Sequence, residues 1–262
     1  MNDILTLTGR VALVTGAGQG VGQQVAEHFA AHDATVIVND YFAERAQSVA
    51  DAITARGGKA FAVQADVTSL ESVKAMFAQA RELAGPIDIL VNNAGNLGAT
   101  PSPDARKPFW EHGPEVWAGA IDVNLYGVIN CTSAATPDMI ERQRGRIITI
   151  ISDAGRVGEA GLEVYSAAKA GAAGFMRAVA RSLGRYQVTA NCVAISATFT
   201  PAIEKRLKDN PEMLKKMMSK YVIRRPGKPT DVANMVLFIA SDASEWITGQ
   251  TYPVNGGYAF AV

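Results

Sequence analysis

Short apolar runs alternate along the chain with stretches in which apolar residues recur every three or four positions. The short runs are typical of buried strands, and the longer period indicates amphipathic helices. Val73, Met76, Phe77 and Ala80 form one such helical stripe. The expected strands span residues 10–15, 35–40, 61–65, 87–91, 147–151, 188–193 and 251–257.

Strands that alternate with helices on short connections form a parallel sheet with helices on both faces. We therefore predict a doubly wound α/β fold. No repeat or low-complexity linker interrupts the pattern, so residues 1–262 are expected to form a single domain.

Two segments break the alternation. Residues 96–117 hold four prolines and three large aromatic residues, and long loops of this kind are often functional. Phe109 and Trp110 are expected either to wall a substrate pocket or to pack within a surface loop. Residues 197–222 include a charged, Met-rich amphipathic piece, which is either a mobile substrate lid or a packed surface helix.

The composition is ordinary for a globular protein: 48% of residues are hydrophobic, 19% are charged, and the formal net charge is zero. Nothing indicates a nucleic-acid or anionic-membrane partner. No apolar run reaches the roughly 20 residues of a membrane helix, and the start lacks the pattern of a secretory signal. We expect a cytoplasmic protein. The cysteines and histidines show no metal-ligand spacing, so no metal is predicted.

The first strand runs directly into a glycine-rich turn, and helical periodicity follows. Strand, glycine turn and helix form the context that a dinucleotide-binding fingerprint requires. The glycines allow a tight turn, which brings backbone N–H groups and a helix amino terminus close to a pyrophosphate. The predicted cofactor contacts in this turn are Gly16, Gln19, Gly20, Val21 and Gly22.

Asp40 ends the second strand, about 20 residues past the glycines, where a carboxylate accepts hydrogen bonds from ribose hydroxyls. Its charge would repel a 2′-phosphate, and the neighbouring Gln19 and Asn39 are neutral. The sequence therefore favours NAD over NADP. Arg45 could still reach a phosphate, so NADP stays the alternative.

The next two strands end in further candidate cofactor residues. An acid after the third strand could meet the adenine amino group, and small residues after the fourth let the chain approach a flat ligand closely. These residues are Asp66, Val67, Asn93, Ala94 and Gly95.

The strand 147–151 ends in Ser152, and the following helix carries Tyr165 and Lys169 four residues apart on one face. A serine at the carboxyl end of a strand can meet them where open α/β sheets bind ligands. A free tyrosine has a pKa of about 10, and a neighbouring lysine cation lowers it. Such a tyrosine can exchange a proton with an alcohol or carbonyl, while the serine holds the same oxygen.

Taken together, these motifs resemble those of the classical short-chain dehydrogenases/reductases over essentially the whole chain. The matching motifs are Thr15 to Gly22, Asp66-Val67, Asn92 to Gly95, Asn124, Ser152 and Tyr165-Ser-Ala-Ala-Lys169. The resemblance implies a Rossmann-type seven-stranded sheet, an NAD(P)(H) cofactor, and a homotetramer or homodimer.

The resemblance also implies residue roles. Tyr165 would be the acid/base, Ser152 would bind the reacting oxygen, and Lys169 would lower the tyrosine pKa and bind the nicotinamide ribose. Asn124 would hold a water in a proton relay. Thr198 and Thr200 would sit near the carboxamide of the cofactor.

One departure concerns the turn after the sixth strand, where the family usually has Pro-Gly and this chain has Ile195-Ser196. The turn loses proline's fixed φ and glycine's freedom, which weakens the prediction for Thr198 and Thr200. The segment 152–158 also resembles that of dehydrogenases acting on β-hydroxyacyl thioesters, including cyclic acyl-CoA types.

The leading hypothesis is an NAD-dependent oxidoreductase that transfers a hydride between a secondary alcohol or ketone and nicotinamide. An NADP-dependent 3-oxoacyl reductase and an inactive nucleotide-binding scaffold are the alternatives. The resemblance argues against an enoyl reductase, because those members space their tyrosine and lysine differently.

Overall fold

The structure is a computed structural model that describes residues 3–95, 107–199 and 211–260. Within these residues, seven parallel strands form one sheet in the order β3-β2-β1-β4-β5-β6-β7, which confirms the predicted fold. The strands are β1 (Val11–Val14), β2 (Thr35–Asp40), β3 (Lys59–Gln64), β4 (Ile89–Asn92), β5 (Gly145–Ser152), β6 (Val188–Ile195) and β7 (Thr251–Val254).

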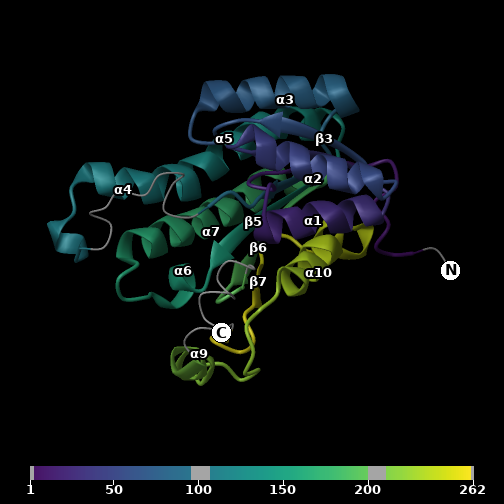
Figure 1. Ribbon diagram of the computed structural model, residues 1–262. Coiled ribbons are helices and arrows are strands. Elements are labelled where there is room, and N and C mark those ends of the chain that lie inside the picture. The colour runs from purple at the N-terminus through teal and green to yellow at the C-terminus, as the bar shows by residue number, and fades with distance from the viewer. Residues whose placement is uncertain (1–2, 96–106, 200–210, 261–262) are drawn as a thin grey trace.

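Helices cover both faces of the sheet (Figure 1). On one face lie α1 (Gly20–Ala31), α2 (Ala43–Ala55) and α10 (Pro229–Ala240); on the other lie α3 (Leu70–Ala84), α5 (Gly127–Glu141) and α7 (Glu163–Leu183). Alternate strand residues enter opposite cores, so Leu13 belongs to the core with Met76, and Val14 to the core with Phe29. A strand buried on both faces needs apolar residues throughout, which explains the continuous apolar runs.

All strands point the same way, so their carboxyl ends meet at one edge of the sheet. The strand order reverses between β1 and β4, which lie side by side. A reversal of this kind opens a crevice beyond the strand ends, and ligands of open α/β sheets bind there.

Several local features differ from the sequence prediction. The expected long helix around Asn124 is divided into α4 (Pro114–Ile121), the π-helical segment η3 (Asp122–Tyr126) and α5. The loop after Ser152 contains a short helix, α6 (Ala154–Val157). Of the lid segment, the structure describes α9 (Pro211–Met218). Short helical turns are η2 (Phe109–Glu111), η4 (Gly184–Tyr186) and η5 (Asp242–Ser244).

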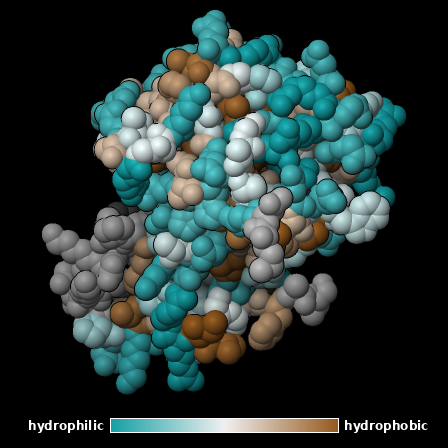
Figure 2. Space-filling model, turned by 90° about the vertical axis from the view of Figure 1, so that its right-hand side faces the viewer, coloured by the Kyte–Doolittle hydropathy of each residue, from teal (hydrophilic) through white to brown (hydrophobic). Residues whose placement is uncertain are grey.

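The face of the molecule in Figure 2 is mostly hydrophilic, with hydrophobic residues in small separate groups. In the three described stretches, no helix combines the length and apolar character needed to cross a membrane. Cys131 and Cys192 are both buried, and burial raises the pKa of each thiol to about 12. Both belong to the hydrophobic core on the face of the sheet covered by α3, α5 and α7.

Candidate functional site

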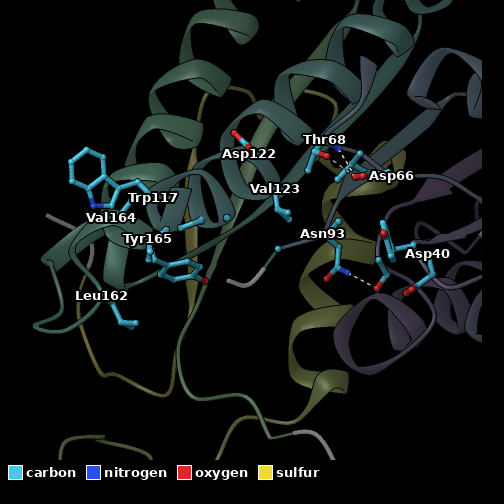
Figure 3. A pocket seen from close by; sticks show the side chains of 18 of the residues that line it. Asp40, Asp66, Thr68, Asn93, Trp117, Asp122, Val123, Leu162, Val164 and Tyr165 are labelled. Carbon is cyan, nitrogen blue, oxygen red and sulfur yellow. Dashed lines mark hydrogen bonds between the residues drawn. The ribbon is translucent and has the colours of Figure 1, made fainter. Parts of the chain in front are cut away.

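A cavity of about 630 Å³ lies along the carboxyl ends of the strands, within the usual range for ligand pockets. In Figure 3, Asp40 and Asp66 lie toward one end, and Tyr165 lies toward the other with its hydroxyl facing the interior. The predicted cofactor residues that line this cavity are Gly16, Gln19, Gly20, Val21, Asp40, Asp66, Val67, Asn93, Ala94, Gly95 and Tyr165.

The glycine turn forms one wall of the cavity. Gly20 is the first residue of α1, so the unpaired N–H groups of that helix end face the same region. A Cβ at Gly18 would lie 2.7 Å from Asp40 Oδ2, and one at Gly22 would lie 2.4 Å from Asn93 Nδ2. Glycine at these two positions therefore lets the turn pack directly against the ends of β2 and β4. Gly16 and Gly20 of the same turn line the cavity, where a pyrophosphate could approach the helix end.

Asn93 and Asp40 hold the turn in place through hydrogen bonds. Asn93 Nδ2 donates to the carbonyl oxygens of Thr15 (2.9 Å) and Gly16 (3.0 Å). The Asp40 carboxylate accepts from the N–H groups of Gly18 and Phe42, each at 3.0 Å. These contacts keep a negative charge at the cavity wall, where the sequence predicted one.

A cation also lines this end of the cavity. The guanidinium of Arg45 lies 4.2 Å from the centre of the Phe42 ring, and both residues contribute to the wall beside Asp40. The Asp66 carboxylate accepts hydrogen bonds from the N–H (2.9 Å) and the hydroxyl (2.8 Å) of Thr68. It thereby stabilises the turn formed by residues 66–68.

Ser152, Tyr165 and Lys169 lie together beside the other end of the cavity, and Tyr165 is the one of the three that lines it. Ser152 is the last residue of β5, and Tyr165 and Lys169 lie in the first two turns of α7. The hydroxyl of Ser152 lies near the Tyr165 phenol and lowers its pKa. Lys169 Nζ lies 5.8 Å from the centre of the Tyr165 ring and donates to the carbonyl oxygen of Ile150 at 2.9 Å.

Asn124 reaches this group from the π-helical segment η3, and its side chain is fully buried. Its Nδ2 donates to the Ala120 carbonyl oxygen at 2.8 Å. A Cβ at Gly95 would lie 2.6 Å from Asn124 Oδ1 and 2.8 Å from Lys169 Nζ. The two side chains thus converge on the Cα of Gly95, and any larger residue there would displace them. A π-helical turn inside a helix is frequently found at functional sites.

Burial controls the protonation of the site. It raises the pKa of Tyr165 above its ordinary value, with a partial offset from the hydroxyl of Ser152 and a further rise from nearby Glu159. Burial also lowers the pKa of Lys169 to about 8. The sequence predicted a lowered pKa for Tyr165, whereas the net shift is upward because burial is its largest cause. The effect of Lys169 on this pKa stays a prediction.

The two aromatic residues expected to wall a substrate pocket, Phe109 and Trp110, lie in different surroundings. Phe109 lines the cavity, and its ring packs edge-on against that of Trp110, with centroids 5.4 Å apart. Trp110 is 72% exposed and is not among the described residues of the cavity wall. Trp117 and Leu162 line the cavity instead; no spacing in the sequence distinguishes them from packing residues.

The remaining cofactor residues lie elsewhere. Gly22 and Lys169 are buried behind the cavity wall. Thr198 lines a second cavity, and its hydroxyl donates to the Ser196 carbonyl oxygen at 3.1 Å. Thr200 lies outside the described residues, as do residues 96–106 and 201–210 of the two expected substrate loops.

Known proteins that are similar to this chain identify its family. The family model described as enoyl-(acyl carrier protein) reductase matches residues 16–259. The (2S)-[(R)-hydroxy(phenyl)methyl]succinyl-CoA dehydrogenase subunit BbsD of Thauera aromatica is 39% identical, with 95% of this chain and 96% of that protein covered. The 3-oxoacyl-[acyl-carrier-protein] reductase FabG of Staphylococcus aureus is 38% identical, with 94% and 96% covered.

A solved 7α-hydroxysteroid dehydrogenase in complex with NADH and 7-oxo glycochenodeoxycholic acid has the same fold. Its TM-score is 0.90 at 35% identity, with 98% of each chain covered. The chain therefore belongs to the classical short-chain dehydrogenase/reductase family of oxidoreductases. The names of these proteins concern different substrates, so they establish the family and the pyridine-nucleotide cofactor class alone.

Proposed function

We propose that this chain is an NAD-dependent oxidoreductase that transfers a hydride between a secondary alcohol or ketone and nicotinamide, with Tyr165 as the acid/base. The observation that carries the proposal is the placement of the phenol. It lies beside Ser152 and opens on a cavity whose opposite end is a glycine turn and a helix amino terminus. The cofactor residues fit a dinucleotide, because Gly16 and Gly20 of the glycine turn line the cavity at the amino terminus of α1.

The chain's own residues would move the proton. A bound nicotinamide supplies the hydride acceptor or donor. In alcohol oxidation, Tyr165 Oη takes the hydroxyl proton as the carbinol hydrogen leaves with its electron pair; in ketone reduction, it returns a proton to the carbonyl oxygen. The Ser152 hydroxyl would donate to that same oxygen. Lys169 and Asn124, which converge at Gly95, would hold the nicotinamide ribose and a relay water.

The proposal is tested by mixing the purified protein with NAD⁺ and secondary alcohols, and by following the absorbance of the reduced cofactor. Two similar proteins act, by name, on CoA or acyl-carrier-protein thioesters. Hydroxyacyl thioesters are therefore the first substrates to try, followed by cyclic alcohols and hydroxysteroids. Cofactor binding without turnover across this panel would favour an inactive nucleotide-binding scaffold.

The pH dependence should differ between the two directions. Because burial raises the pKa of Tyr165, the protonated phenol persists at neutral pH and suits ketone reduction. Alcohol oxidation needs the phenolate, so its kcat should rise with pH toward that pKa, whereas kcat for reduction should fall over the same range. Initial rates in both directions between pH 6 and 11 would check this; parallel profiles would contradict it.

Cofactor preference should depend on the charge of Asp40. Asp40→Asn keeps an oxygen that can accept from Gly18 but removes the charge that repels a 2′-phosphate. We expect the ratio of kcat/KM for NAD to that for NADP to fall by about tenfold or more, since close charge pairs are worth several kcal/mol at about 4 Å. Asp66→Asn is the control and should leave the ratio unchanged.

An NADP-dependent 3-oxoacyl reductase is the second candidate, because Arg45 lines the cavity beside Asp40 and the FabG protein is similar over nearly the whole chain. Higher kcat/KM with NADP than with NAD in the unmodified protein would support it. The homotetramer or homodimer and the cytoplasmic location stay predictions.

A further inference from the structure

The turn that follows β6 begins beside the site. Ile195 is the last residue of β6 and pairs with Ser152 across the sheet. Its carbonyl oxygen also accepts the N–H of Asp153 at 2.9 Å. The conformation of residues 195–199 therefore bears on the strand end that places Ser152 beside Tyr165. The turn contains neither proline nor glycine, so its own dihedral preferences do not determine its path.

A buried tyrosine from a distant segment holds this turn. Tyr221 is 8% exposed, and its Oη lies 2.6 Å from Ser196 Oγ and accepts the N–H of Ala197 at 3.2 Å. One hydroxyl thus bonds both a side chain and the backbone of the same turn. The Tyr221 ring also packs against Tyr258, with centroids 5.1 Å apart, which fixes the position of the hydroxyl.

Backbone hydrogen bonds join the same two segments. The N–H of Gly227 donates to the Ala197 carbonyl oxygen at 3.0 Å, and the N–H of Phe199 donates to the Gly227 carbonyl oxygen at 2.8 Å. At its other end, Tyr221 donates its own N–H to the Met218 carbonyl oxygen in α9 at 3.1 Å. Figure 1 shows α9 outside the two helical layers. Tyr221 therefore connects α9, in the expected substrate lid, to the turn after β6.

We infer that Tyr221 is a positioning residue for the nicotinamide end of the cofactor, acting through the 195–199 turn. Ser196 supplies the side chain with which the Tyr221 hydroxyl forms its hydrogen bond. The Tyr221 hydroxyl adds to the two backbone hydrogen bonds with Gly227, so removing it loosens the turn at Ser196 and Ala197 while the sheet stays intact. The inference rests on the proposed function, because it assigns the turn to a nicotinamide cofactor.

The first test compares two ligands that differ at one end. Tyr221→Phe removes the hydroxyl but keeps the buried ring. We expect the dissociation constant for NADH, measured by fluorescence titration, to rise about five- to tenfold, as for the loss of a buried hydrogen-bond pair. ADP-ribose, which lacks the nicotinamide, should bind as it does to the unmodified protein. Tyr258→Phe removes the hydroxyl of the ring that packs against Tyr221. It should change the dissociation constant of neither NADH nor ADP-ribose.

The second test requires no cofactor. In Tyr221→Phe, amide hydrogen exchange should become faster at Ala197 and Phe199, whereas the β5 amides keep their protection. Ser196→Ala should also weaken NADH binding. Adding it to Tyr221→Phe should change the affinity little further, because Tyr221→Phe already removes the contact that Ser196→Ala removes.

Unchanged NADH affinity in Tyr221→Phe, or an equal loss for NADH and ADP-ribose, would overturn the inference and leave the proposed function standing. Failure of the unmodified protein to bind NADH or NADPH would overturn the proposed function itself. Unchanged exchange at Ala197 would show that the hydroxyl does not hold the turn.

Discussion

Tyr165→Phe is expected to reduce turnover by on the order of 10³-fold, because it removes the group that exchanges the proton with the substrate oxygen. The phenylalanine ring keeps the shape of the cavity wall, and the glycine turn at the other end is untouched. The dissociation constant for the reduced cofactor should therefore change little. An effect confined to kcat is the signature of an interaction made in the transition state.

Steady-state rates with the best substrate of the panel, together with fluorescence titration of NADH, would check this result. Tyr186→Phe is a suitable control, because Tyr186 lies in η4, at the far end of α7 from Tyr165. Turnover retained in Tyr165→Phe would refute the assigned role. Loss of cofactor binding along with turnover would show that the phenol is structural.

Lys169→Met is expected to lower turnover on the order of 100-fold without lowering the thermal midpoint at pH 7. The amine contributes to the site by holding charge next to the phenol and the cofactor ribose. In the free protein the same amine is buried, which lowers its pKa from 10.5 to about 8. Folding at pH 7 therefore requires a desolvated cation, and an apolar side chain of similar length avoids that cost.

The stability effect has a defined pH window. Because the native pKa is depressed, the unfolded chain binds the proton more tightly, and the penalty is fully present below pH 8. Native stability gains as pH rises from about 8 toward 10.5, so the advantage of Lys169→Met should shrink across this range. Thermal midpoints at pH 7 and pH 10 would measure it.

Lys74→Met, at an exposed position in α3, is the matched control for Lys169→Met. It should change neither turnover nor the pH dependence of the thermal midpoint. A midpoint for Lys169→Met that is several degrees lower at pH 7 would show that the bond to the Ile150 carbonyl oxygen outweighs the desolvation cost.

Much of this molecule follows from local sequence patterns. Continuous apolar runs such as Ile147–Ile151 predict strands buried on both faces, and their alternation with helices predicts a parallel sheet. In such a sheet all carboxyl ends share one edge, so Ser152 and the glycine turn must lie on the same side. The four-residue spacing of Tyr165 and Lys169 places both on one helix face. These inferences need only the periods of helix and strand.

Other features could not be predicted in this way. The π-helical turn at Asn124, the Lys169 bond to Ile150 and the convergence at Gly95 arise where three separate elements meet. The hydroxyl of Tyr221 reaches a turn 25 residues earlier in the chain. Contacts between residues this far apart in the sequence leave no trace in the helical and strand periods of the chain.

The sequence alone therefore determined the fold, the shared edge of the sheet and the residue types gathered there. Only the tertiary structure decided the protonation of those residues: it raised the pKa of Tyr165 where the sequence predicted a decrease. The physical reason is that residue type and spacing specify which charges are neighbours, whereas desolvation depends on how completely the rest of the chain excludes water from them.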